Sequence, residues 1–192
     1  MLEDIKKLRE ETGAGVVDVK KVLDEADGNM DIARDLLRKR GQAKALKKAD
    51  RETHEGIIGS YVHSNGKVAG MVKVLCETDF VARNEVFKDL ARDLAMHVVA
   101  SNPQVVSADD VSDTVIQKER AVWVEQLAAE GKPQEIIDTI LAGKEKKFRE
   151  ENALLSQPFV KDPERTVSDV ITEAIAKIGE KITVEEFVRF EL

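Results

Sequence analysis

The spacing of apolar residues changes twice along this chain, and these changes limit the possible fold more than any single motif does. Within residues 1–40 the apolar residues recur at helical spacing, whereas residues 57–75 form two β-rich runs. Helical spacing then returns in residues 86–98. A pair of strands between helical segments predicts an α+β fold rather than an all-helical one.

Residues 1–41 predict a small module of three short helices. The breaks fall at Thr12-Gly13-Ala14-Gly15 and Asp27-Gly28-Asn29, and the third helix is expected to run from Asp31 to Gly41. A core built from roughly 40 residues is marginal, which is typical of a small adaptor module. A DNA-binding helix-turn-helix is the rival interpretation, but residues 1–54 hold 13 basic and 12 acidic residues, a near-neutral balance that argues against it.

A basic run occupies the segment between Arg38 and Arg51, where Asp50 is the only acidic residue. It overlaps residues 42–54, which we interpret as a basic linker. Such runs usually form a solvated linker helix. The same charges also suit a docking strip for an acidic or phosphorylated partner.

Residues 55–192 predict an α+β core built on a three-stranded antiparallel sheet. Ser64-Asn65-Gly66 is a strong hairpin signal, and residues 182–190 alternate well enough for a third strand. Helices are expected to begin near Asn84, Ser112, Pro133 and Val167, with Glu130-Gly131-Lys132-Pro133 closing the second and a loop at residues 157–163. Because so small a sheet has exposed edges, we expect this core to be the dimerisation domain as well.

Composition and motifs exclude several classes of protein. The net charge of −7 argues against general nucleic-acid binding, and the single cysteine, Cys76, excludes an internal disulfide framework. The start, MLEDIKKLRE, does not resemble a signal peptide, and no apolar run could span a membrane, so a reducing cytoplasm is the expected location. No phosphate-binding loop, dinucleotide fingerprint or metal-ligand spacing is present, which predicts no cofactor, no metal and no covalent catalysis.

The segment CETDFVARNEVF, residues 76–87, joins the end of a strand-like run to the start of a helix. Phe80 stands at this junction in a chain with only 4% aromatic residues. Phe80 would either pack beneath the sheet or project from the turn into a pocket on a partner. The charged neighbour Asp79 favours the second interpretation, because it keeps the turn near solvent.

Five segments of the chain together resemble the elongation factor Ts family. They are residues 12–23 (TGAGVVDVKKVL), 41–45 (GQAKA), 65–69 (NGKVA), 78–84 (TDFVARN) and 157–162 (QPFVKD). They follow the family's order and span nearly the full chain, so the match is specific. One departure is Val16-Val17, where many members carry methionine.

The resemblance implies a guanine nucleotide exchange factor for elongation factor Tu, which would bind that GTPase in its GDP-bound and nucleotide-free states. The turn Thr78-Asp79-Phe80-Val81 would then enter the GTPase domain and disturb its magnesium and phosphate site. The N-terminal module would resemble a ubiquitin-associated three-helix bundle and dock on the same domain through Thr12, Gly13, Ala14, Gly15, Val16, Val17 and Lys20, with further matching positions from Ile32 to Leu37. A single core copy resembles the short, homodimeric type, without a nucleic-acid or membrane partner.

Three alternatives stay open at this stage. The chain could be an adaptor without exchange activity, in which Phe80 belongs to the core. It could be an enzyme that uses Cys76 as a nucleophile. It could also bind nucleic acid through the basic run, which would make binding steeply salt-dependent.

Overall fold

The computed structural model describes residues 2–130 and 133–192 and confirms the α+β class. The N-terminal module contains three helices, α1 (Leu2–Thr12), α2 (Val16–Glu25) and α3 (Met30–Leu46), as predicted. Asn29 caps α3 by accepting hydrogen bonds from the backbone N–H groups of Asp31 and Ile32. A small apolar core unites the three helices through Leu8, Val19, Val22, Leu23, Ala26 and Ala33.

The predicted end of α3 at Gly41 is wrong, because the helix continues to Leu46. Gly41 is buried in the middle of the helix, where a Cβ atom would lie 3.4 Å from the Cβ of Ala176. The glycine therefore lets α3 approach α8 (Val167–Ile178) closely instead of capping the helix. Part of the predicted linker is consequently helical and packed against the core.

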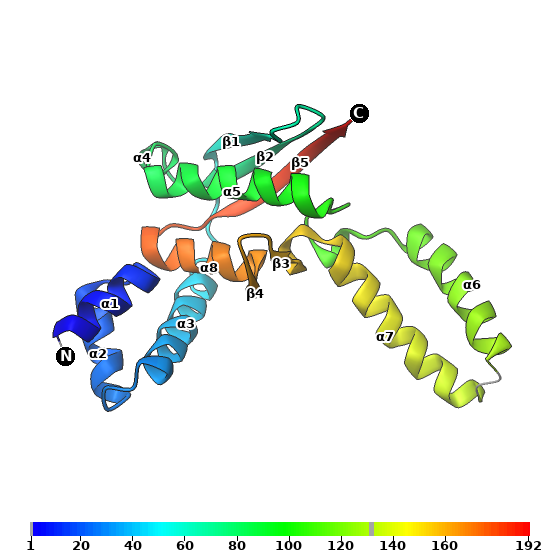
Figure 1. Cartoon of the computed structure of the whole chain (residues 1–192), viewed down its shortest axis with the longest axis horizontal. Coiled ribbons are helices and arrows are strands. Elements are labelled where there is room, and N and C mark those ends of the chain that lie inside the picture. Colours follow the sequence, from blue (N-terminus) through cyan, green and yellow to red (C-terminus); the bar gives the residue numbers. More distant parts are fainter. Residues whose placement is uncertain (1, 131–132) are drawn as a thin grey trace.

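The three predicted strands form one antiparallel sheet in the order β1 (Glu55–Val62), β2 (Val68–Cys76) and β5 (Thr183–Glu191) (Figure 1). The turn between β1 and β2 contains Gly66 at φ +67°, a conformation that glycine adopts without strain. Val72, Val74 and Cys76 all lie on the buried face of β2. That face is covered by α5 (Glu85–Ser101), which begins at the predicted cap Asn84.

The main core lies between the sheet, α5 and α8, and the other side of α8 contacts α3. The N-terminal module is therefore attached to the core mainly through one helix pair (Figure 1). A short helix, α4 (Asp79–Ala82), joins β2 to α5 and lies toward the same end of the molecule as the module.

A helical hairpin of α6 (Asp113–Ala129) and α7 (Gln134–Asn152) projects from the opposite end (Figure 1). It has its own apolar cluster, in which the Trp123 and Phe148 rings pack edge to face with centroids 5.9 Å apart. Ser112 and Pro133 precede these helices as predicted, whereas Gly131 and Lys132 of the predicted closing turn lie outside the described residues. Two 3₁₀ turns flank the hairpin, Ala108–Asp110 and Leu154–Ser156.

The predicted loop at residues 157–163 contains a small hairpin, β3 (Pro158–Phe159) paired with β4 (Asp162–Thr166). The reason is tertiary, because the backbone N–H of Val160 donates to Nδ1 of buried His97 on α5, at 3.1 Å. β4 then leads into α8 through a capping box formed by Thr166 and Asp169.

Candidate functional site

Residues 78–82 form a single helical turn, and their side chains differ sharply in solvent exposure. Phe80 is 81% exposed, whereas Ala82 is buried and Val81 packs on the main core. Asp79 forms an ion pair with Arg83 at 3.0 Å on the exposed side. The phenylalanine thus projects from the turn into solvent, and a core role for its side chain does not fit this structure.

Thr78 begins this helical turn as its N-cap. Its hydroxyl oxygen accepts a hydrogen bond from the N–H of Val81 at 3.4 Å, and its hydroxyl proton is donated to Glu180 Oε1 at 2.7 Å. Its carbonyl accepts hydrogen bonds from the N–H of Ala82 and the Cys76 thiol. The hydroxyl and the carbonyl oxygen of Thr78 therefore both form hydrogen bonds within the chain.

Glu180 holds this turn from the other end of the sequence. Its Oε2 atom accepts the backbone N–H groups of Glu77 at 3.1 Å and Thr78 at 3.0 Å. Glu180 follows Gly179, which ends α8 in the left-handed region at φ +91°. Sequence reasoning missed this residue; only the glycine cap after α8 indicated where the chain would turn.

Glu77 makes the reciprocal contact, since its side chain binds the backbone of the residue that follows Glu180. Its carboxylate accepts the backbone N–H of Lys181 at 2.6 Å and pairs with the Arg51 guanidinium at 3.1 Å. These interactions, the Lys181 hydrogen bond above all, lower the pKa of Glu77 below its ordinary value. Lys181 in turn donates its Nζ protons to the carbonyl oxygens of Ala49 and Arg51.

The residues expected to form the docking surface of the N-terminal module fall into two groups. Val16, Val17 and Lys20 lie on the outer surface of α2, with Val17 66% exposed. Thr12 ends α1, where its hydroxyl donates to the Leu8 carbonyl, and Gly13, Ala14 and Gly15 form the connection from α1 to α2. This connection faces the core as well, since a Cβ at Gly13 would lie 2.8 Å from the Lys177 side chain.

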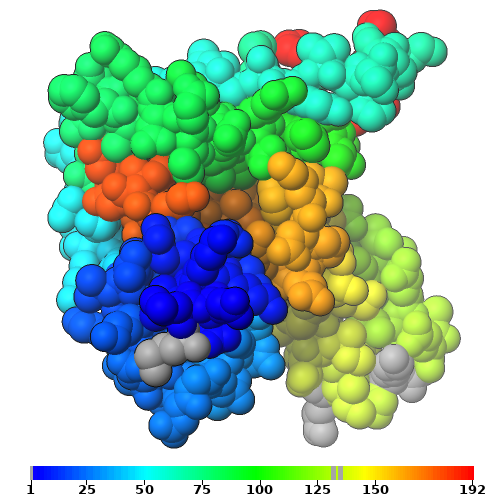
Figure 2. All heavy atoms as spheres, turned by 60° about the vertical axis from the view of Figure 1, so that its left-hand side comes forward, coloured from blue at the N-terminus to red at the C-terminus, as the bar shows by residue number. Residues whose placement is uncertain are grey.

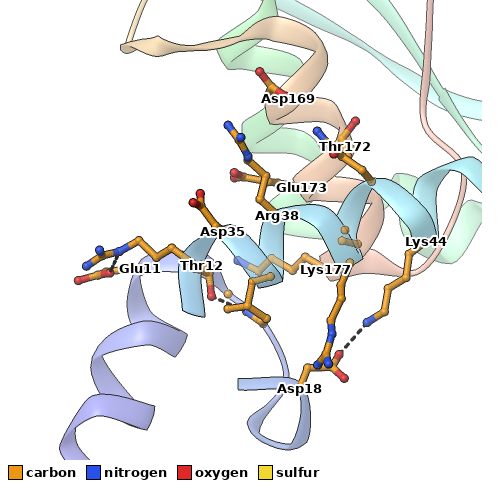
Figure 3. Close-up of a pocket in the computed structure, with 18 of the residues that line it drawn as sticks. Glu11, Thr12, Asp18, Asp35, Arg38, Lys44, Asp169, Thr172, Glu173 and Lys177 are labelled. Atoms are coloured by element: carbon orange, nitrogen blue, oxygen red, sulfur yellow. Dashed lines mark hydrogen bonds and ion pairs between the residues drawn. The ribbon is translucent and has the colours of Figure 1, made fainter. Parts of the chain in front are cut away.

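A cavity of about 370 Å³ lies between this connection, α3 and α8. Figure 3 shows Arg38 and Asp35 of α3 on one side and Asp169, Glu173 and Lys177 of α8 on the other. Because both signs of charge line the cavity, its walls select neither an anion nor a cation.

The two predicted binding regions are on the same side of the molecule. In Figure 2 the blue N-terminal module and the green atoms of α4 and α5 flank the orange atoms of α8. The module and α4 thus lie toward one end of the molecule, and the α6–α7 hairpin projects from the opposite end (Figure 1).

Three basic residues of the run between Arg38 and Arg51 form ion pairs within the chain. Arg40 pairs with Glu25, Lys44 with Asp18 at 2.7 Å, and Arg51 with Glu77. The first two pairs attach α3 to α2, and the third joins the segment after α3 to the residue that follows β2. For these three residues the contacts favour a structural role over a nucleic-acid site.

Cys76 does not have the properties of a nucleophile. The thiol is buried, and burial, together with the charge of Glu180, raises the pKa of Cys76 to about 11. At neutral pH it is therefore a thiol that packs as a small apolar group.

Within residues 2–130 and 133–192, no group of three or more His, Cys, Asp or Glu side chains is arranged to hold a metal ion. Likewise, none of the helices in this part of the chain has the length and apolar character needed to cross a membrane.

The chain is similar to known proteins along nearly its whole length. The family model described as elongation factor TS matches residues 30–192. Elongation factor Ts of Moorella thermoacetica is 49% identical over 98% of this chain and 93% of its own length. Elongation factor Ts of Oleidesulfovibrio alaskensis is 51% identical, over 98% and 95%, and that of Thermosipho melanesiensis is 53% identical, over 97% and 95%. The chain belongs to the elongation factor Ts family.

Proposed function

We propose that this protein is a guanine nucleotide exchange factor for elongation factor Tu and promotes GDP release during polypeptide elongation in the cytoplasm. The observation that carries the proposal is the exposed Phe80 side chain on a turn whose base is held by hydrogen bonds. Family membership supplies the partner class. The site residues in this scheme are Thr78, Asp79, Phe80 and Val81.

In this scheme no covalent bond changes, because an exchange factor acts by binding the nucleotide-free partner more tightly than the loaded one. Such coupling is reciprocal, so returning nucleotide also releases the factor. A thousandfold change in nucleotide affinity corresponds to about 4 kcal/mol. Burying one phenylalanine side chain contributes about 1.5–3 kcal/mol, so Phe80 would supply a large share and other contacts the remainder.

The N-terminal module, residues 1–41, would supply those other contacts. Val16, Val17 and Lys20 are exposed on α2, and the module lies toward the same end of the molecule as α4, the helix that carries Phe80 (Figure 1). Thr12, Gly13, Ala14 and Gly15 shape the connection that orients α2. The core, residues 55–192, would carry the inserting turn.

The test is the release of fluorescent GDP from elongation factor Tu with wild-type protein, Asp79→Ala and Phe80→Ala. We expect strong acceleration by the wild type and a large loss in Phe80→Ala. Because Phe80 is exposed, its replacement should change the free energy of unfolding by no more than about 0.5 kcal/mol. Val122→Ala, which shortens an exposed apolar side chain on α6, serves as the control and should retain full activity.

Two results would count against the proposal. GDP release that is no faster with the wild-type protein than without it would contradict the exchange function. If the protein then still bound elongation factor Tu tightly, it would be an adaptor without exchange activity. Acceleration that survives in Phe80→Ala would keep the function but place the inserting group elsewhere.

We also propose that the protein is a homodimer joined through the open face of its sheet. Opposite α5, the sheet carries the exposed apolar side chains of Ile58, Val62, Met71, Val188 and Phe190. The strand register places Met71 beside Val188, and Ala69 beside both Val62 and Phe190, so these residues form one patch, whereas Ile58 lies opposite Lys73. Contiguous exposed apolar surface of this kind is typical of an interface.

A further inference from the structure

The turn that carries Phe80 is joined to the start of β5 by two glutamates, each of which binds the backbone beside the other. Glu180 accepts the N–H groups of Glu77 and Thr78, and Glu77 accepts the N–H of Lys181. The two segments are about a hundred residues apart in sequence. These reciprocal hydrogen bonds join two chain segments whose proximity cannot be predicted from local sequence patterns.

We propose that Glu180 is a positioning residue for nucleotide exchange, which holds the turn from Thr78 to Val81 so that Phe80 enters the partner already oriented. This inference rests on the proposed function. Glu180 itself would not touch the nucleotide or its metal, and it would act only through the backbone and hydroxyl of Thr78.

The physical need for such a residue follows from the size of α4. A helix of one turn is unstable by itself, because its nucleation costs more than its few hydrogen bonds return. Phe80 cannot supply the missing stability, since it is 81% exposed in the free protein. The order of the turn must therefore come from contacts below it.

Glu180 provides three of these contacts, and all three involve the residues at the start of the turn. Across residues 2–130 and 133–192, every hydrogen bond of the Glu180 carboxylate goes to Glu77 or Thr78. Hydrogen bonds to a charged acceptor are stronger than neutral ones. Ordering the turn before binding removes an entropic cost that would otherwise reduce the affinity for the partner.

The same contact region reaches the segment that follows the N-terminal module. Arg51 pairs with Glu77, and the Lys181 ammonium donates to the carbonyl oxygens of Ala49 and Arg51 at 2.6 and 2.8 Å. The end of the connection from α3 is thereby attached beside the Thr78 turn. One small network thus relates the position of the docking module to that of Phe80.

The test is a double-mutant cycle on the rate of GDP release, with Glu180→Ala, Phe80→Ala and the double variant. If Glu180 acts through the placement of Phe80, Glu180→Ala should slow exchange about tenfold in the wild-type background and have little effect once Phe80 is absent. Amide hydrogen exchange of the free protein should also show faster exchange at Glu77, Thr78 and Val81 in Glu180→Ala.

Two further variants sharpen the result. Glu180→Gln should restore much of the activity, because its amide oxygen can accept the two N–H groups and its amide can donate to the Thr78 hydroxyl. Glu150→Ala removes the same charge from an exposed pair with Lys146 on α7 and should leave exchange unchanged.

The possible failures can be told apart. Equal losses in both backgrounds would mean a general structural role and would overturn the proposal. Full activity of Glu180→Ala beside a strongly impaired Phe80→Ala would overturn it while the exchange function stands. A wild-type protein that does not accelerate release would overturn the exchange function and this inference with it.

Discussion

Gly59 lies where β1 crosses α5, and a Cβ atom there would stand 2.2 Å from the carbonyl oxygen of Ala91. Because that neighbour is helix backbone, it cannot rotate away. We expect Gly59→Ala to lower the free energy of unfolding by about 1–3 kcal/mol or more, because the added methyl group would overpack the contact between β1 and α5. Urea denaturation measures the change.

Gly143 offers the matched control for this prediction. It lies inside α7 with nothing within 4 Å of its Cβ position, so Gly143→Ala should stabilise the protein by about 0.5–1 kcal/mol through helix propensity. An unfolding midpoint for Gly59→Ala at or above the wild-type value would show that β1 and α5 can separate at little cost.

At the scale of elements, His97 connects α5 to the β3–β4 hairpin and to the end of α7. Its Nδ1 accepts the Val160 N–H, so its Nε2–H donates to Gln157 Oε1 at 2.9 Å, and the Gln157 amide donates to the Glu151 carbonyl. The ring is fully buried and stacks on Phe159. This contact is why residues 157–163 are a hairpin rather than an open loop.

Burial lowers the pKa of His97 below its usual value of 6.5, so the folded protein keeps a neutral ring where the unfolded chain takes up a proton. The unfolded state then binds more protons, and stability falls as the pH drops below about 6.5. We expect the free energy of unfolding by urea to be smaller at pH 5.5 than at pH 7.5. In His97→Gln this pH dependence should shrink, and an unchanged dependence would assign it to other groups.

At the scale of the whole molecule, the exposed sheet face predicts self-association. Met71 lies at the centre of the patch, paired in register with Ser60 and Val188. Met71→Glu should convert a dimer into a monomer of 21.3 kDa, because a charge would be buried without a partner in the interface. Sedimentation velocity over a wide concentration range measures the mass.

Val122→Glu is the control, since it places the same charge on a similarly exposed apolar position of α6. It should leave the mass unchanged. A wild-type protein that sediments as a monomer at every concentration would contradict the dimer.

Much of the fold could be predicted because its signals are local. Gly66 and Asn84 each act within a few residues, so the hairpin turn and the start of α5 appeared where the sequence placed them. Gly41 was misjudged because a buried glycine and a capping glycine look the same in sequence, and only the position of Ala176 tells them apart. Whether Phe80 would be buried or exposed was also ambiguous in the sequence, since the alternation of apolar residues in β2 did not reveal which face α5 would cover.

By itself the sequence determined the class of the fold, the order of its main helices and strands, and the resemblance to the elongation factor Ts family. These depend on the spacing of apolar residues and on short motifs, which act over a few residues. Only the tertiary structure decided that Phe80 points outward and that Glu180 holds the turn from Thr78 to Val81. It also decided that the N-terminal module lies toward the same end of the molecule as α4. Those features depend on contacts between segments about a hundred residues apart, and such contacts exist only once the chain has folded.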